Sequence, residues 1–230
     1  MSMSELLRLH YAPDNASLCV RLALQELGMT YETVLVDRRL RAHKSDAFLA
    51  MNPNGLIPVL ETPHGPMFET AAIIIWLADR ERALLPTPSA PDRMYAMQWM
   101  VWLANTLHPT LRTLFYPEQY ADGDIDPTYR MAKIRLQQHL DVLEAAQTAD
   151  WLESSEATAQ GCYLAPMLRW SKLYGGGPDW FDLGQWPRLK AFAQRTEIRD
   201  AARTVALAEG LGPTPFSSPS PCNPPEGSAL

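Results

Sequence analysis

Apolar and polar positions divide the chain into a first part that mixes strand-like and helix-like spacing and a second part whose spacing is helical throughout. Residues 6–11 and 31–36 alternate as half-buried strands do. Residues 17–27 carry apolar side chains three and four positions apart until Gly28 ends the pattern. A strand, a helix and a second strand in this order predict a β-α-β unit at the start of the fold.

The next part of the pattern centres on an apolar run at residues 56–60, which follows a turn signal at residues 52–55. Pro58 lacks the N–H that a central strand donates, so this strand is expected to bend or to lie at an edge. A short strand at residues 67–68 and then a helix with apolar 3-4 spacing follow it. With a polar, irregular helix at residues 38–50, the order β-α-β-α-β-β-α predicts a small mixed sheet covered by helices.

Beyond residue 84 the strand signals end. Residues 85–92 are rich in proline and cannot continue a helix, so they predict a linker between domains. Long helical patterns then occupy residues 93–115, 127–146, 158–173, 187–196 and 200–209. The expected organisation is an α/β domain over residues 1–84, the linker, an all-helical domain over residues 93–212, and a tail over residues 213–230. The tail has six prolines among eighteen residues, so we expect it to be flexible unless it docks on the body or on a partner.

The proline-containing strand and the helix after it carry the first candidate binding site. If the Ile57-Pro58 bond is cis, the chain bends and the backbone N–H and C=O of Ile57 point outward, where an extended peptide can pair with them. The alternative is a trans proline on an ordinary edge strand. Glu69 and Thr70 stand at the start of the helix, whose free N–H groups suit a carboxylate. Thr70 adds a donor and Glu69 can hold an ammonium group, which together suit an α-amino acid; the competing interpretation is a helix cap alone.

Composition narrows the class of protein. The chain has 230 residues, 47% of them apolar, which suffices for two modest domains with a substantial core. A formal charge of −6 and a pI near 5.4 argue against nucleic acid or an anionic membrane as the main partner.

No apolar run approaches the ~18 residues of a membrane span, and residues 1–5 lack the start of a signal peptide. A cytoplasmic location is therefore expected. Cys19, Cys162 and Cys222 have no metal-binding spacing, so free thiols and no metal site are expected.

A β-α-β-α-β-β-α domain with a proline-led third strand, joined to an all-helical domain, resembles the cytosolic glutathione S-transferases over residues 6–211. The resemblance is carried by Asn52-Pro53-Asn54-Gly55-Leu56-Ile57-Pro58-Val59-Leu60, by Glu69-Thr70-Ala71-Ala72-Ile73, and by the part of the C-terminal half that runs from Tyr163 through Leu168-Arg169-Trp170-Ser171 to Trp186-Pro187-Arg188-Leu189. The resemblance implies a thioredoxin-like first domain, a cis Pro58, and pairing of the Ile57 backbone with the cysteinyl part of glutathione. It also implies that Glu69 and Thr70 hold the γ-glutamyl end.

Two further contacts to glutathione are expected near the same turn. Asn54 belongs to the turn itself, and Arg41 belongs to a basic segment just before it. An arginine of that segment is suited to pair with the glycine carboxylate of glutathione, although the segment can equally be a solvated face.

Within this family the chain is most similar to the bacterial beta class. The similar stretches are Tyr11-Ala12-Pro13 leading into Ser17-Leu18, Thr106-Leu107-His108, and Leu168-Arg169-Trp170-Ser171. Ala16 stands where the beta class has a cysteine, which excludes thiol-disulfide chemistry at that point. Pro109 replaces a lysine, and Gly161 replaces an aspartate in a capping box that begins at Thr158. Loss of that carboxylate removes one capping bond, worth ~0.5–2 kcal/mol.

Glutathione transfer requires an ionised thiol, whereas a free thiol has a pKa of ~8.5. A donor beside a helix N-terminus lowers that pKa. Ser17, at the start of the first helix, is the first candidate donor, although it can be only an N-cap. Asn15 is second and Tyr11 is third, the latter with a core position as its alternative. His108 is a candidate for positioning water or the acceptor, whereas Cys19, flanked by leucines, is expected to fill the core.

The acceptor site is expected in a cleft between the domains, since two helices of the second domain supply apolar side chains there. These candidates are Leu111, Phe115, Tyr116, Met167 and Trp170. They imply an apolar electrophile, and the expected protein is a homodimeric, cytoplasmic bacterial glutathione transferase acting in detoxification, with peroxidase activity as an option. The open alternatives are a non-catalytic glutathione-binding or ligand-carrying protein of the same fold, and a glutathione-dependent isomerase or dehalogenase.

Overall fold

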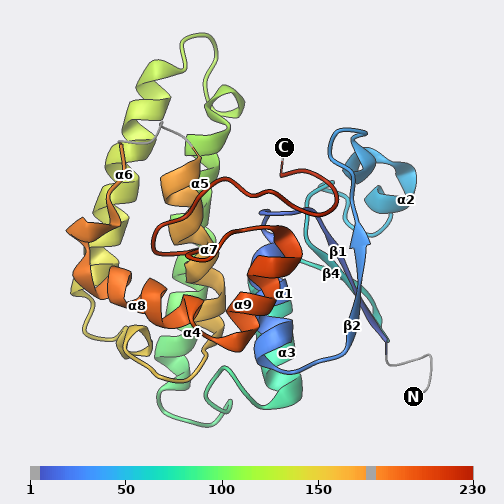
Figure 1. The fold of residues 1–230 in the computed structure, drawn as a ribbon, viewed down its shortest axis with the longest axis horizontal. Coiled ribbons are helices and arrows are strands. Elements are labelled where there is room, and N and C mark those ends of the chain that lie inside the picture. The colour runs from blue at the N-terminus through green and yellow to red at the C-terminus, as the bar shows by residue number, and fades with distance from the viewer. Residues whose placement is uncertain (1–5, 175–179, 230) are drawn as a thin grey trace.

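The computed structural model describes residues 6–174 and 180–229 (Figure 1). Residues 1–5, on which the signal-peptide prediction rests, and residue 230, at the end of the tail, lie outside the described residues. The first half contains β1 (Leu7–Tyr11), α1 (Ser17–Glu26), β2 (Tyr31–Leu35), η2 (Ala42–Lys44), α2 (Asp46–Leu49), β3 (Val59–Thr62), β4 (Gly65–Phe68) and α3 (Thr70–Glu81). This is the predicted order, with the irregular helix formed as two short ones.

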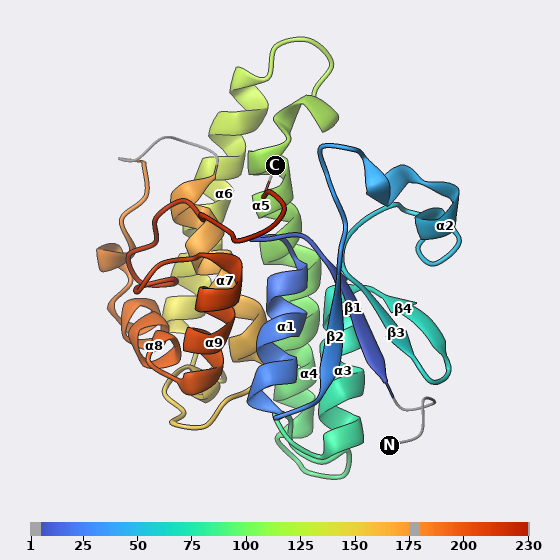
Figure 2. The same ribbon diagram turned by 45° about the vertical axis from the view of Figure 1, so that its right-hand side comes forward.

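The four strands form one mixed sheet in the order β2-β1-β3-β4. β1 runs parallel to β2 and antiparallel to β3, with Leu9 opposite Leu60. β3 begins at Val59 and not at residue 56, because Pro58 has no N–H for the ladder. Figure 2 shows α1 and α3 on one face of the sheet and α2 on the other.

The second half is helical. It contains α4 (Arg93–Trp102), η3 (Leu103–Leu107), α5 (His108–Phe115), η4 (Pro117–Gln119), α6 (Asp126–Ala145), η5 (Asp150–Leu152), α7 (Ala159–Leu173), η6 (Leu183–Gln185), α8 (Pro187–Glu197) and α9 (Asp200–Glu209). The helix predicted over residues 93–115 is present as α4, η3 and α5 in direct succession, with η3 a π-helical turn. Within the described ranges, no helix is both long and apolar enough to cross a membrane.

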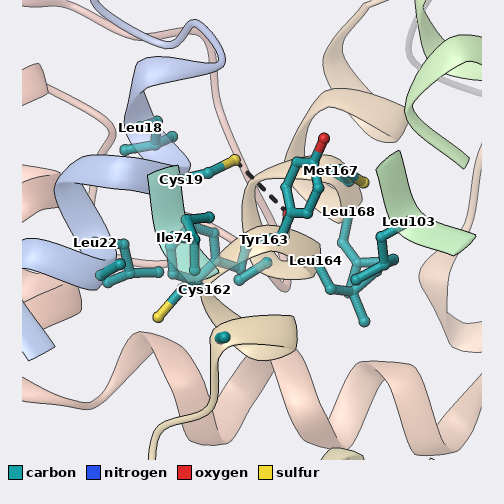
Figure 3. Packing of buried hydrophobic residues seen from close by; sticks show 14 of the residues in the cluster. Leu18, Cys19, Leu22, Ile74, Leu103, Cys162, Tyr163, Leu164, Met167 and Leu168 are labelled. Carbon is teal, nitrogen blue, oxygen red and sulfur yellow. Dashed lines mark hydrogen bonds between the residues drawn. The ribbon is translucent and has the colours of Figure 1, made fainter. Parts of the chain in front are cut away.

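Helix α7 lies at the centre of the core. Every residue from 159 to 171 is buried, so the helix is covered on all sides. In Figure 3, Cys19 of α1 lies beside Tyr163 of α7, and Leu18 of α1 and Ile74 of α3 belong to the same group of packed side chains. Buried side chains of the sheet-containing half and of the helical half therefore belong to one continuous core.

The tail after Gly212 packs on the body of the protein. The sequence predicts a flexible tail unless it docks on the body or on a partner, and the structure shows that it docks on the body. Phe216 is buried, and the carboxylate of Glu197 accepts hydrogen bonds from the backbone N–H of Phe216 and of Ser217, at 3.2 and 2.9 Å. From there the chain crosses the helices and ends in the region between α5 and α2 (Figures 1 and 2). Hydrogen-bonding partners on the body, which composition does not reveal, hold this proline-rich segment.

Candidate functional site

The predicted cradle is formed by the loop before β3 and by the start of α3. The Ile57-Pro58 bond is cis, as predicted. Ile57 lies outside β3, half-buried against the small cluster of Val36, Phe48 and Val59. At the start of α3, Glu69 is the exposed N-cap residue, whose side chain makes no capping bond, and Thr70 is buried. The Glu69 carboxylate is thus not used to cap its own helix.

The turn before Ile57 is braced by the basic segment. The ammonium group of Lys44 donates to the carbonyl of Asn54 at 3.2 Å. Gly55 has φ of 59°, and a Cβ at this position would lie 2.7 Å from Nζ of Lys44 and 2.8 Å from the carbonyl oxygen of His43. Only glycine fits this approach without a shift. Arg41, the other predicted contact of this region, is exposed and has φ of 55°.

A buried charge network fixes the loop that precedes α1. Asp14 accepts hydrogen bonds from Nε and Nη2 of Arg169 at 2.8 and 2.9 Å, from Nε1 of Trp170 at 2.8 Å and from the hydroxyl of Tyr174 at 2.5 Å. Its own N–H donates to Glu209 at 2.8 Å. Both ion-pair side chains are fully buried. Sequence reasoning missed this pair, although an arginine inside the apolar segment that became α7 was its available signal.

Ser17 is the first helical residue of α1 and is fully buried. Its hydroxyl donates to the carbonyl of Ala12 at 3.1 Å, so that proton is engaged by the chain itself. The N-cap position belongs to Ala16, whose side chain cannot cap the helix. The hydroxyl of Ser17 is therefore a backbone brace in this structure.

Asn15 and Tyr11 direct their donors to the end of the tail. One amide N–H of Asn15 donates to the carbonyl of Pro13 at 2.8 Å, and Nδ2 also donates to the carbonyl of Ala229 at 3.1 Å. The hydroxyl of Tyr11 donates to the carboxylate of Glu226. Burial, followed by this hydrogen bond, raises the pKa of Tyr11 well above its usual range. Tyr11 therefore stays protonated, and its hydroxyl proton is available as a hydrogen-bond donor.

His108 follows the π-helical turn directly. Its Nδ1 shares a hydrogen bond with the hydroxyl of Tyr163 at 2.9 Å, and its ring lies 5.8 Å from that of Trp170. Burial, and then the nearby guanidinium of Arg112, lower the pKa of His108 from 6.5 to about 4. The imidazole is therefore neutral near pH 7, so it can donate or accept a hydrogen bond but supplies no charge.

The predicted acceptor residues divide into two groups. Leu111 and Trp170 are buried in the core, and the Trp170 indole is held by Asp14. Phe115 and Tyr116 are half-buried, and the hydroxyl of Tyr116 accepts a hydrogen bond from Nη2 of Arg38 at 3.1 Å. Arg38 also donates through Nη1 to Oδ1 of Asn15 at 2.9 Å. This arginine thus joins the loop before α1 to the end of α5.

The cysteines are placed as predicted. Cys19 is fully buried, and its Sγ lies 3.7 Å from the carbonyl oxygen of Tyr163 (Figure 3). Burial raises the pKa of Cys19 well above its usual range, so its thiol stays protonated and unreactive. Cys162 is likewise buried, Cys222 is half-buried, and all three are free.

Residues 16–80 match the family model described as the N-terminal domain of glutathione S-transferase. The chain is 29% identical over 209 residues to the glutathione S-transferase GstA of Escherichia coli O157:H7, and the match covers 89% of this chain and 100% of that protein. The similarity therefore extends from the sheet-containing half into the helical half.

Solved structures give the same picture. A sphingomonad glutathione S-transferase complexed with glutathione is 28% identical, with a TM-score of 0.73, and covers 89% of this chain and 100% of its own. A bacterial beta-class glutathione S-transferase of Sphingomonas chungbukensis is 27% identical, with a TM-score of 0.73, and covers 88% of this chain and 98% of its own. The fold predicted from the sequence, a thioredoxin-like domain followed by an all-helical one, is confirmed.

Proposed function

We propose that this chain is a member of the glutathione S-transferase family, and that it is a glutathione transferase that uses glutathione as its co-substrate. The reaction joins the glutathione thiolate to an electrophilic carbon: a C–S bond forms and the leaving group departs with its electron pair. The observation that carries the proposal is the cradle itself: the exposed Glu69 carboxylate, which makes no capping bond, stands next to Thr70 at the start of α3, and the backbone of Ile57 lies outside the strand ladder.

The cradle supplies complementary groups for a γ-glutamyl peptide. The exposed carboxylate of Glu69 suits the α-ammonium group, and the first turn of α3 with Thr70 suits the α-carboxylate. The backbone of Ile57, outside the strand ladder, suits the cysteinyl peptide unit. Asn54 and Arg41 lie in the adjoining segments, where the glycine end of the tripeptide would be held.

The N-terminus of α1 and the side chain of Asn15 are the groups best suited to stabilise the glutathione thiolate. The positive end of the α1 dipole favours a thiolate. The second amide N–H of Asn15 already reaches an acceptor from outside its own loop, the Ala229 carbonyl, so a ligand sulfur can take the place of that oxygen. Ser17 contributes less in this proposal, because its hydroxyl donates to Ala12.

Several finer properties belong to the same proposal. Residues 1–84 form the glutathione-binding domain, residues 85–92 the linker and residues 93–212 the acceptor domain. Phe115 and Tyr116 line the acceptor site, and His108 orients the acceptor or a water molecule. The protein is a cytoplasmic bacterial homodimer that removes apolar electrophiles, with peroxidase activity as a side reaction.

The test is conjugation measured for the wild type and for Asn15→Ala and Ser17→Ala. We expect Asn15→Ala to lower kcat/KM about tenfold or more by removing a donor to the developing thiolate, and Ser17→Ala to lower it less. Glutathione affinity should stay within about threefold in both, since the cradle is untouched. Equal, full activity in the Asn15 variant would remove the assignment of that donor.

A second function, glutathione binding without turnover, is favoured by one observation. The donors of Tyr11 and Asn15 are both engaged by the tail, and Ala16 offers no nucleophile. Calorimetric binding of glutathione combined with no conjugation or peroxide reduction across a panel of electrophiles would establish this alternative. An isomerase or dehalogenase would instead show activity in the same panel with its own substrate class.

A further inference from the structure

The C-terminal tail consists of two parts that are held differently. The proximal tail, residues 213–224, is built into the body: the carbonyl of Ser220 accepts from Nη2 of Arg169 at 2.9 Å, and the N–H of Asn223 donates to the carbonyl of Gly210 at 2.8 Å. Phe216, which belongs to this part, is buried. This part is structural, because its removal would leave a buried arginine short of acceptors.

The distal tail, residues 225–229, instead meets the candidate thiol site. The carboxylate of Glu226 accepts a hydrogen bond from the hydroxyl of Tyr11. The carbonyl of Ala229 accepts from Nη1 of Arg38 at 2.6 Å and from Nδ2 of Asn15 at 3.1 Å. The distal tail therefore supplies acceptors to the donors that surround the start of α1.

The same segment also borders the candidate acceptor wall. Arg38 binds Ala229 through one nitrogen and the hydroxyl of Tyr116 through the other, at 3.1 Å. Figures 1 and 2 both show the last described part of the tail in the region between α5 and α2. An acceptor that reaches a thiol held at Asn15 from the side of Tyr116 must therefore pass the distal tail.

Glu226 carries the negative charge of the described part of the distal tail. Among the described residues, the hydroxyl of Tyr11 is the sole hydrogen-bond partner of the Glu226 carboxylate, and no ion pair includes it. Of the two nearby guanidinium groups, that of Arg21 pairs with the carboxylate of Glu209 at 3.2 Å. Arg38 donates to the neutral oxygens of Ala229 and Tyr116 and so keeps its positive charge, which the carboxylate of Glu226 opposes.

We propose that Glu226 is a specificity-determining residue of the acceptor site, whose carboxylate, held against Tyr11 by the distal tail, disfavours anionic acceptors relative to neutral ones. This inference rests on the proposed transferase function and deepens it. A negative charge a few ångströms from an incoming carboxylate raises the energy of the carboxylate's approach. The same charge has little effect on the approach of a neutral acceptor. The effect weakens as salt screens the exposed carboxylate.

The test compares two probes that undergo the same aromatic substitution, with formation of a C–S bond and loss of chloride. One is neutral chlorodinitrobenzene, and the other is its anionic analogue chlorodinitrobenzoate. Glu226→Gln keeps the shape and the acceptor for Tyr11 but removes the charge. We expect it to raise the anionic-to-neutral ratio of kcat/KM about fivefold, with most of the increase lost at high salt.

Two companion variants and one control sharpen the test. Gly227 has φ of 74°, and a Cβ there would lie 2.6 Å from Cδ1 of Leu35, so Gly227→Ala should loosen the distal tail while keeping the charge in the chain. Truncation after Pro224 removes the distal tail and leaves the proximal tail intact. Both should raise the ratio as Glu226→Gln does. Asp92→Asn, an exposed charge loss before α4 at a residue without a side-chain capping bond, should leave it unchanged.

The outcomes separate cleanly. If Glu226→Gln changes the ratio no more than Asp92→Asn does, while both probes are turned over, the inference is overturned and the transferase function stands. If truncation raises kcat/KM equally for both probes and Glu226→Gln leaves the ratio unchanged, the distal tail only obstructs access to the site. The inference is then again overturned. If glutathione binds but no variant turns over either probe, the proposed function fails and the inference with it.

Discussion

Asp14 contacts no expected substrate atom, yet it fixes where the candidate thiol donor lies. It has φ of 53°, a left-handed conformation that favours glycine, and it immediately precedes Asn15. Four hydrogen bonds to its carboxylate and one from its N–H hold it in that conformation. Asp14 is therefore a positioning residue for the loop, and Arg169 is its main partner.

The first prediction at this scale concerns that ion pair. Arg169→Met leaves the buried carboxylate of Asp14 without its cation and should destabilise the fold by ~3–5 kcal/mol. The matched control is Arg93→Met, which breaks the pair with the partly exposed Asp79 and should cost only ~0–1 kcal/mol. Urea unfolding measures both. Equal losses of unfolding free energy in the two variants would mean that the buried Asp14–Arg169 pair contributes no more to stability than the Arg93–Asp79 pair.

The second prediction concerns His108. Its pKa is lowered from 6.5 to about 4, so between these values the unfolded chain binds a proton that the folded chain does not. Stability must therefore fall as the pH falls through this window. Since the residue keeps part of its surface exposed, we expect a contribution of ~1–2 kcal/mol.

His108→Gln should flatten that part of the stability profile, whereas substitution of the exposed His64 by glutamine should leave it unchanged. Chemical unfolding at a series of pH values provides the measurement. A profile for the His108 variant that parallels the wild type would show that this imidazole does not titrate as described.

Individual residues were predictable from sequence where local chemistry decides their geometry. Gly55 follows from its turn, Pro58 from its missing N–H, and Cys19 from its leucine neighbours. The sequence signals a buried arginine at position 169, but its pairing with Asp14 was not predictable, because the two residues stand 155 positions apart. The same holds for the tail contacts of Tyr11, since pairing over that separation depends on the packed fold.

At the scale of elements, α7 depends on its N-cap more than an exposed helix would. Thr158 accepts a hydrogen bond from the N–H of Gly161 at 3.0 Å, and the first turn carries no acidic residue. The reciprocal half of a capping box is thus absent. Since residues 159–171 are all buried, fraying at this end would disturb the core itself.

Thr158→Ala should therefore lower the free energy of unfolding by ~1 kcal/mol, equivalent to a fall in Tm of about 2–4 °C for a chain of this size. Thr158→Ser keeps the accepting oxygen and should retain most of the stability. Thermal unfolding followed by circular dichroism distinguishes them. A serine variant as unstable as the alanine variant would point to lost methyl packing and not to lost capping.

Most elements follow from their periodicity, and the exceptions have physical causes. α1, α7 and α9 begin or end within about a residue of their predicted bounds, because apolar spacing agrees there with an end signal: Gly28 after α1, Thr158 before α7 and Gly210 after α9. β3 starts late because of Pro58. The π-helical turn of η3 interrupts a pattern that spacing alone predicts as one regular helix, and no residue in Leu103–Leu107 signals it.

At the scale of the whole molecule, one core joins both halves. Leu18 of α1 and Tyr163 of α7 belong to the same buried cluster, as Figure 3 shows. The halves should therefore unfold together. Leu18→Ala, which should cost ~2–5 kcal/mol, is expected to lower the unfolding midpoint reported by tryptophan fluorescence, although most tryptophans lie in the helical half. A fluorescence transition that stays in place would show that the halves are independent.

Glutathione binding by the loop before β3 together with the start of α3 is the central property proposed for this protein. The direct measurement is a calorimetric titration of the wild type and of Glu69→Gln with glutathione, with Asp92→Asn as the control. We predict saturable binding by the wild type, unchanged affinity in the control, and an affinity about tenfold or more weaker in Glu69→Gln, since an ionic contact to the ammonium group is lost. An absence of binding at millimolar glutathione, or equal affinity in all three proteins, would contradict it.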